Sequence, residues 1–161
     1  MKRVLAAFVV IATAFGTAAV AGNHNHRAAH VVFWVPDSWS IEGDDASQLT
    51  VADPRGEVAL LFVLKDHHDM KAAIATIDDT IATIATDVKV GAQRAVNING
   101  MEGVAVDGTG RAGGKHVELS VLIVRTPANK YLMIFGVLES AHKHDHDAEL
   151  AKMLASLRPV R

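Results

Sequence analysis

The sequence predicts an α+β fold, a mainly antiparallel β-sheet sandwiched between helices in an α/β/α arrangement. Residues 57–64 and 131–138 are apolar at nearly every position, which is typical of strands covered on both faces. Isoleucines at helical spacing between residues 70 and 88 predict an amphipathic helix that covers one face of the sheet. Asn99-Gly100, between two strand-like segments, is a strong hairpin signal and favours antiparallel pairing.

The first half of the domain is expected to supply four strands separated by turns. Pro36-Asp37-Ser38 and Asp53-Pro54-Arg55-Gly56 combine residues that favour tight turns. The strand-like segments on either side of these turns are residues 31–35, 39–42, 48–52 and 57–64.

A single helix is expected after the fourth strand, with Asp69 as its cap. Six apolar residues follow at alternating spacings of four and three, namely Met70, Ile74, Ile77, Ile81, Ile84 and Val88. Burial of the four isoleucines contributes about 6–12 kcal/mol, from ~1.5–3 kcal/mol each, before conformational entropy is subtracted. Because β-branched residues are mediocre helix formers, docking on the sheet must hold this helix.

The second half is expected to form a meander followed by a short helix. Asp147 is the expected cap of this last helix, which carries Leu150, Leu154 and Leu157 and stops before Pro159. The strand-like segments of the meander are residues 94–98, 101–106, 116–124 and 131–138, with a flexible turn at 108–114 and a polar loop at 142–146.

The chain begins with a pattern typical of a signal peptide. Met1-Lys2-Arg3 is basic, residues 4–15 are apolar over a length too short to span a bilayer, and Ala19-Val20-Ala21 is a small-x-small cleavage pattern. We expect cleavage after Ala21 and export to the periplasm, or secretion. An uncleaved anchor or a buried helix is the alternative. The expected organisation is a signal peptide at 1–21, a flexible His-rich arm at 22–30 and one domain at 31–161.

Composition excludes several classes of function. No cysteine is present, so disulfides, thiol catalysis, thiolate zinc sites and a lipid-modified N-terminal cysteine are excluded. Loss of Lys2 and Arg3 with the leader leaves 14 of the 16 basic side chains against 18 acidic ones, a net charge of about −4. Such a domain is poorly suited to phosphate backbones, so we expect no nucleic-acid partner. We also expect no membrane span after cleavage.

Four short motifs of the domain resemble the PsbP/Mog/DcrB-like superfamily. They are Phe33-Trp34-Val35-Pro36-Asp37-Ser38-Trp39, Asp53-Pro54-Arg55-Gly56, Ile98-Asn99-Gly100-Met101-Glu102-Gly103 and Ser156-Leu157-Arg158-Pro159. The resemblance implies an α/β/α sandwich around an antiparallel sheet and a binding or assembly role rather than an enzymatic one. It carries over no functional residue, and the absence of a lipidation cysteine is a departure from DcrB.

Nine histidines, mostly in clusters, are the most unusual feature of the sequence. His142, His144 and His146 alternate with Lys143 and Asp145, so an extended backbone would place the three imidazoles on one face. Three imidazoles on one face can hold Zn²⁺, Cu²⁺ or Ni²⁺. The alternative is a solvated polar loop before a helix, and no defined cofactor is required. His67-His68 is interpreted as part of a helix N-terminal region.

Two further motifs have a structural alternative beside the functional one. Gly108-Thr109-Gly110-Arg111-Ala112-Gly113 matches a dinucleotide-binding glycine pattern, but a strand-like segment follows it instead of a helix. We therefore interpret it as a hairpin loop. Trp34 and Trp39 are candidate aromatic contacts for a protein partner, with core and turn packing as the alternative.

No motif of nucleophilic, metallopeptidase or kinase catalysis is present, so the protein is expected not to be an enzyme. The favoured hypothesis is an exported binding or assembly factor that docks a protein partner in the periplasm. The alternative is a periplasmic metal-binding protein that uses its His-rich segments.

Overall fold

The computed structural model describes residues 22–44, 46 and 48–160; the predicted signal peptide and its cleavage site lie outside this part of the chain, except for Gly22. Every strand pairing within the described residues is antiparallel. The α+β class with a mainly antiparallel sheet is therefore confirmed.

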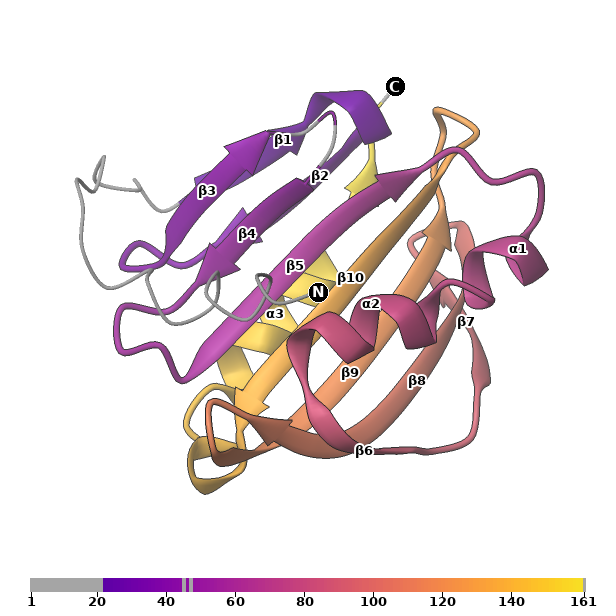
Figure 1. The fold of residues 1–161 in the computed structure, drawn as a ribbon. Coiled ribbons are helices and arrows are strands. Elements are labelled where there is room, and N and C mark those ends of the chain that lie inside the picture. The colour runs from indigo at the N-terminus through magenta and orange to yellow at the C-terminus, as the bar shows by residue number, and fades with distance from the viewer. Residues whose placement is uncertain (1–21, 45, 47, 161) are drawn as a thin grey trace.

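A large sheet forms the centre of the molecule (Figure 1). Its strands lie in the order β3-β4-β5-β10-β9-β8-β6, and β7 also pairs with β8. Their bounds are β3 (Ser40–Asp44), β4 (Gln48–Ala52), β5 (Val58–Lys65), β10 (Tyr131–Glu139), β9 (Lys115–Arg125), β8 (Met101–Ala112), β6 (Thr86–Val90) and β7 (Arg94–Ile98).

A second, three-stranded sheet consists of β1 (Gly22–His26), β2 (Val31–Val35) and β11 (Arg158–Pro159) in the order β1-β2-β11. The flexible arm predicted at residues 22–30 is wrong, because β1 pairs with β2 along its whole length and a 3-10 turn, Arg27–Ala29, joins them. The local sequence is polar, but its backbone pairs with a strand whose side chains enter the core. His26, opposite Val31, is buried as a result.

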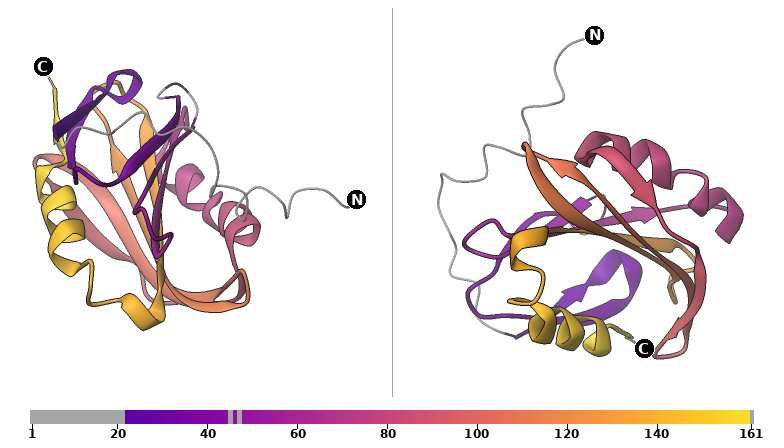
Figure 2. Two further views of the ribbon diagram at one scale, coloured as in Figure 1. Left: turned by 90° about the vertical axis from the view of Figure 1, so that its left-hand side faces the viewer. Right: turned by 90° about the horizontal axis from the view of Figure 1, so that it is seen from below.

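The two faces of the large sheet are covered by different layers, as both views of Figure 2 show. On one face lie α1 (Met70–Ile74) and α2 (Ile77–Ile84), packed on side chains such as Met133 and Phe135. On the other face, α3 (Asp147–Ser156) and the small sheet share the cover over side chains such as Phe62. The second helical layer expected from the sequence is thus only partly helical.

The predicted Ile-striped helix is present in two pieces. Asp69 caps the first piece by accepting a hydrogen bond from the Ala72 amide at 2.7 Å, as expected. The helix is interrupted before Ile77, and the predicted last position of the stripe, Val88, belongs to β6 instead. Residues 86–90 carry β-branched side chains at alternate positions and pair with β8, so sheet pairing replaces the last helical turn there.

Two tight hairpins connect the strands of the meander. Asn99 and Gly100 both have positive φ, at 50° and 90°, as the predicted two-residue turn requires. The predicted flexible turn at 108–114 is wrong in extent, because β8 continues to Ala112 and only Gly113-Gly114 turn the chain. At Gly108 an added Cβ would lie 2.6 Å from the Lys89 carbonyl oxygen, so close packing against β6 explains this glycine of the motif.

The cap of the last helix lies one residue before the predicted one. His146, and not Asp147, occupies the N-cap position of α3. The side of α3 that faces the sheet carries Met153, which is 3 % exposed, and not Leu154, which is 43 % exposed.

Among the described residues, no helix has both the length and the apolar character needed to cross a membrane.

Candidate functional site

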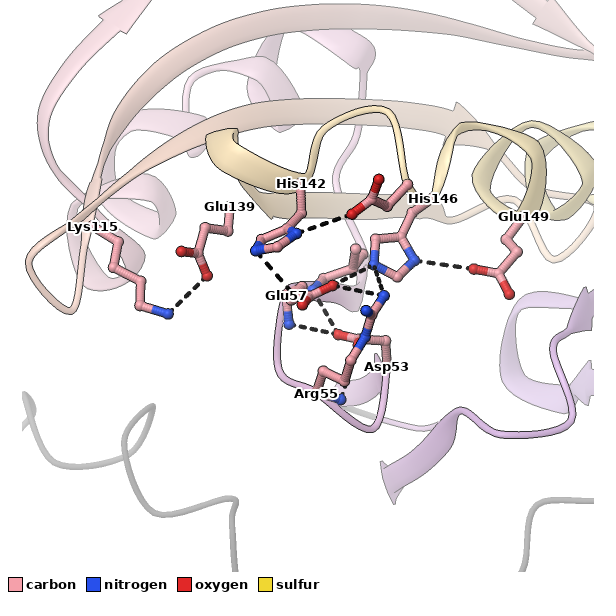
Figure 3. A network of polar contacts seen from close by, with 10 residues as sticks. Asp53, Arg55, Glu57, Lys115, Glu139, His142, His146 and Glu149 are labelled. Carbon is pink, nitrogen blue, oxygen red and sulfur yellow. Dashed lines mark hydrogen bonds and ion pairs between the residues drawn. The ribbon is translucent and has the colours of Figure 1, made fainter.

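Polar side chains from two distant parts of the sequence meet at one end of α3 (Figure 3). The turn between β4 and β5 supplies Asp53, Arg55 and Glu57. The segment that leads into α3 supplies His142, Asp145 and His146, and the first turn of α3 supplies Glu149. These seven residues are called the Glu57 cluster below.

Asp53 builds the turn that holds the Glu57 cluster. Its buried carboxylate accepts hydrogen bonds from the backbone amides of Arg55 at 2.9 Å, Glu57 at 2.6 Å and Val58 at 2.7 Å. Three such bonds satisfy most of the acceptor capacity of the carboxylate. Asp53 therefore acts mainly as a staple of the turn and fixes the direction in which Glu57 leaves the backbone.

Glu57 lies between two imidazoles and a guanidinium. Its Oε2 atom is 3.0 Å from His146 Nε2 and 2.8 Å from Arg55 Nη2, and its Oε1 atom is 3.7 Å from His142 Nε2. The Glu57 side chain is only 11 % exposed and that of His146 only 5 %. The contact between Glu57 and His146 is thus a largely buried link between the β4–β5 turn and the start of α3.

Each histidine of the 142–146 segment contacts an acidic residue three positions later. His142 Nδ1 lies 3.0 Å from Asp145, His144 Nδ1 3.1 Å from Asp147 and His146 Nδ1 3.0 Å from Glu149. A carboxylate at Nδ1 orients the ring and leaves Nε2 to face another group. For His142 and His146 this other group is Glu57.

The electrostatic surroundings of His146 raise the pKa of this residue above its ordinary value. Burial disfavours the imidazolium and lowers the pKa, but hydrogen bonds to Glu149 and Glu57 and the charge of Asp53 outweigh burial. The hydrogen bond from His142 lowers the pKa of the exposed Asp145. The Glu57 cluster therefore favours a protonated His146 between two carboxylates.

The three histidines predicted as metal ligands are not brought together. His144 points away from the Glu57 cluster, with its side chain 77 % exposed. Within the described residues, His146 groups with Asp53 and Glu57 at metal-binding spacing, whereas His142 groups with Glu57 and Asp145. Because the segment forms a 3-10 turn, Ser140–His142, followed by further turns, alternate side chains do not share one face. Glu57 is the residue common to both groups.

Sequence reasoning missed Glu57, Asp53 and Glu149 as partners of these histidines. Two signals were present: an acidic residue three positions after each histidine, and an aspartate that opens the β4–β5 turn. The contact between Glu57 and His146 joins residues about 90 positions apart and has no local sequence pattern, because the antiparallel pairing of β5 with β10 brings these segments together.

An apolar groove of about 210 Å³ lies under the other side of α3. Its floor is the large sheet, with Phe62, Leu122 and Ile134, and its walls include Val96 of β7 and Leu154 of α3. Leu154 and Val90 are the large apolar side chains that are exposed within the described part of the chain, and Val90 lies on the opposite face with α2.

Contacts at both ends hold α3 over this groove. The His146–Glu57 contact fixes its start, and the Asn99 side-chain amide donates hydrogen bonds to the carbonyls of Ala155 at 3.0 Å and Leu157 at 2.7 Å at its end. The ammonium group of Lys152 lies 3.7 Å from the centre of a Trp34 ring. The wall of the groove is therefore a fixed element of the fold.

The two tryptophans predicted as partner contacts have different positions. Trp39 is 1 % exposed, and its ring meets that of His146 edge-on at 5.9 Å, so it belongs to the core beneath the Glu57 cluster. Its burial removes Trp39 from any contact surface of the folded protein. Trp34 is half-buried under Lys152, and its role in partner binding stays a prediction.

Comparison with known proteins finds likeness in structure and none in sequence. No family model matches the chain, and no curated protein matches it. The solution structure of cyanobacterial PsbP (CyanoP) from Synechocystis sp. PCC 6803 matches with a TM-score of 0.62 at 10% identity, over 91% of this chain and 97% of that one.

Two bacterial crystal structures match over similar lengths. One is PA94 from Pseudomonas aeruginosa, described as a protein of unknown function and putative regulator, with a TM-score of 0.56, 15% identity and coverage of 88% of this chain and 98% of that chain. The other is LpqN of Mycobacterium tuberculosis, described as involved in cell envelope biogenesis, with a TM-score of 0.56, 10% identity and coverage of 81% and 83%. The resemblance inferred from the four sequence motifs is confirmed at the level of the fold: this chain has a PsbP-like fold.

Proposed function

We propose that this protein is an exported, non-enzymatic binding or assembly factor, and that it docks a protein partner through the groove beside α3. The observation that carries the proposal is the groove itself, which is lined by apolar side chains and bordered by the exposed Leu154. Apolar side chains exposed next to a preformed depression are typical of a surface that receives another molecule.

The groove fits the apolar side chains of a partner better than it fits a small polar substrate. Its polar side chains are few, and two of them, Arg94 and Asp107, form an ion pair with each other. The histidines and buried carboxylates of the Glu57 cluster do not line it, so it lacks the convergent titratable groups that an active site needs. This separation supports a binding role over an enzymatic one.

The comparisons and the start of the sequence support the cellular setting of the proposal. LpqN is described as involved in cell envelope biogenesis, which fits a role at or beyond the membrane. The basic and apolar leader with its Ala19-Val20-Ala21 pattern supports export. The protein is therefore proposed to meet its partner in the periplasm or outside the cell.

Two matched substitutions test the proposal. Leu154→Asp places a charge at the rim of the groove, and Val90→Asp places one at the other exposed apolar side chain, on the opposite face. Tagged variants are expressed at native level in the source organism, and the companions of each are quantified by mass spectrometry. We expect at least one companion to be lost with Leu154→Asp and retained with Val90→Asp. Equal recovery from both variants would contradict docking at the groove.

A second candidate function, metal binding, is favoured by the position of Glu57 between His142 and His146. The Glu57 cluster offers four carboxylates and two imidazoles against one guanidinium, and the exposed Arg55 can swing out of it. A divalent ion such as Zn²⁺ that binds only the folded state adds about 2.7 kcal/mol of stability at a hundredfold excess over its Kd.

Thermal unfolding with and without Zn²⁺ tests this second function. Glu57→Gln is expected to remove the stabilisation, because Glu57 belongs to both groups of ligand atoms, whereas His144→Ala is expected to retain it. No stabilisation of the unmodified protein, or an equal loss in both variants, would exclude a metal site at the Glu57 cluster.

A further inference from the structure

The first three residues of the processed chain form a pattern with its own metal chemistry. Cleavage after Ala21 makes Gly22 the first residue, followed by Asn23 and His24. We propose that Gly22-Asn23-His24 is a binding site for Cu²⁺, formed by the new N-terminus. This inference rests on the predicted cleavage and is independent of the docking role proposed for the groove.

The chemistry follows from the spacing between the terminal amine and the imidazole. The α-amino nitrogen of Gly22, the backbone nitrogens of Asn23 and His24, and the imidazole Nδ1 of His24 can surround one ion in a plane and close three fused chelate rings. Square-planar nitrogen coordination is the geometry that Cu²⁺ and Ni²⁺ prefer, and Cu²⁺ binds more tightly. The two backbone amides lose their protons to solvent when the ion binds.

The residue types in this segment allow such a chelate. Neither the second nor the third residue is proline, so both backbone nitrogens carry the proton that the ion displaces. Gly22 has no side chain to crowd the plane of the ion. The unprocessed chain lacks this site, because the nitrogen of Gly22 is then an amide within the peptide bond to Ala21.

The fold leaves the segment accessible. Strand β1 is the outer strand of the small sheet, so within the described residues it has a neighbouring strand on one side only (Figure 1). Asn23 is exposed, and Gly22 and His24 are half-buried, with the His24 ring 5.3 Å from that of Phe33. The ion therefore needs only the end of an edge strand to move.

The register defines what metal binding must displace. Trp34 donates its backbone N–H to Ser156 Oγ at 2.7 Å, on the side of β2 that faces away from β1. Because strand residues alternate, Phe33 and Val35 turn their backbone groups toward β1, where they lie opposite His24 and Gly22. Coordination of the ion by the backbone nitrogens of Gly22 and His24 therefore breaks the pairing of His24 with Phe33 and of Gly22 with Val35. The backbone groups of Phe33 and Val35 lose their partners in β1, while the pairing of His26 with Val31 can persist.

The experiment uses protein that has been exported with its own leader and purified from the periplasm. The intact mass is measured first, and we expect it to begin at Gly22. Cu²⁺ is then titrated at neutral pH in the presence of a competing chelator, and the bound ion is examined by visible absorption and electron paramagnetic resonance. We expect one equivalent of Cu²⁺ in a square-planar site of four nitrogens.

Three variants identify the ligands. His24→Gln removes the imidazole, and one alanine inserted between Gly22 and Asn23 moves the imidazole to the fourth position while it preserves the cleavage site. Both are expected to lose the four-nitrogen spectrum. The double variant His142→Gln, His146→Gln is expected to keep it, because the Glu57 cluster takes no part.

Hydrogen exchange gives an independent readout of the same event. We expect Cu²⁺ to accelerate exchange at the backbone amides of Phe33 and Val35 in the unmodified protein and to leave it unchanged in His24→Gln. An N-terminus other than Gly22, or a four-nitrogen spectrum that survives in His24→Gln, would overturn the proposal.

Discussion

The two faces of the large sheet differ in how completely they are covered. The face under α1 and α2 is closed by a stripe of isoleucines, and the cavities there are small, each about 10 Å³. The face under α3 retains an apolar groove of about 210 Å³ and carries the Glu57 cluster at one end of the helix. This difference agrees with the proposal that the first face serves stability and that the second receives a partner.

The covering helices are also held by different interactions. Helix α2 is held by buried apolar side chains, Ile77, Ile81 and Ile84. Helix α3 buries Met153 but depends in addition on polar contacts at both ends. The effects of substitutions on the two helices should therefore differ in the change of stability, in pH dependence and in partner binding.

The largest expected effect is on the closed face. Ile81→Ala removes a side chain that is 6 % exposed and is expected to lower the free energy of unfolding by about 2–5 kcal/mol, because it leaves a cavity that cannot refill. Leu154→Ala on α3 is expected to change it by less than about 0.5 kcal/mol. Urea unfolding of both variants checks this, and equal losses would remove the distinction between the two faces.

The next largest effect concerns the start of α3. His146→Gln breaks the contacts to Glu57 and Glu149 and is expected to cost about 1–3 kcal/mol at mildly acid pH, where His146 is charged. Chemical unfolding against a His144→Gln control measures it, since His144 makes an exposed contact of the same i,i+3 type. An equal effect of both substitutions would show that burial of the His146 pair adds nothing.

The contribution of His146 should depend on pH with a defined sign. Its pKa is raised in the folded state by Glu149 and Glu57 against the opposing effect of burial, so the stabilisation is complete below the ordinary value of 6.5. It is lost as the pH rises through the higher folded-state value. The stability difference between the unmodified protein and His146→Gln, measured from acid to alkaline pH, should therefore shrink with rising pH. A difference that grows would reverse the assignment of the charged state.

A smaller effect is expected at the end of α3. Asn99→Gly removes the amide that binds the Ala155 and Leu157 carbonyls, at a cost of about 0.5–1.5 kcal/mol, while glycine still accepts the positive φ of the hairpin turn. Hydrogen exchange of α3 should accelerate more than that of α2. Uniform acceleration across both helices would show that the capping contacts are not local to α3.

The smallest effect is expected for Lys152→Gln, which removes the cation from above Trp34. Loss of this contact is expected to cost about 0.5–1 kcal/mol, as is usual at exposed sites, and to shift the tryptophan fluorescence. Trp39, buried beside His146, provides the internal reference, since its signal should not respond to this substitution.

The closed face was predictable because its signals are local. The isoleucine spacing and the Asp69 cap are each read within a few residues. The structure confirms the cap and the burial of Ile77, Ile81 and Ile84 on this face. The split before Ile77 and the change to β6 after Ile84 were missed, because pairing with β8 overrides the helical period there.

The open face was not predictable to the same degree. Residues 22–26 form a strand, and not a flexible arm, because they pair with β2. The Glu57 cluster depends on a contact between residues about 90 positions apart. Helix α3 has only ten residues, so its amphipathic pattern is too short to predict which of Leu150, Met153 and Leu154 faces the sheet. The sequence showed that the histidines are clustered, and the fold determines that His142 and His146 contact Glu57.

Site-specific photo-cross-linking in intact cells of the source organism tests whether the α3 face receives a protein partner. A photoreactive residue is placed at position 154 beside the groove and, as the matched control, at position 90 on the closed face. We expect one discrete protein adduct from position 154 and none from position 90. Adducts from both positions, from position 90 alone, or from neither would contradict this expectation.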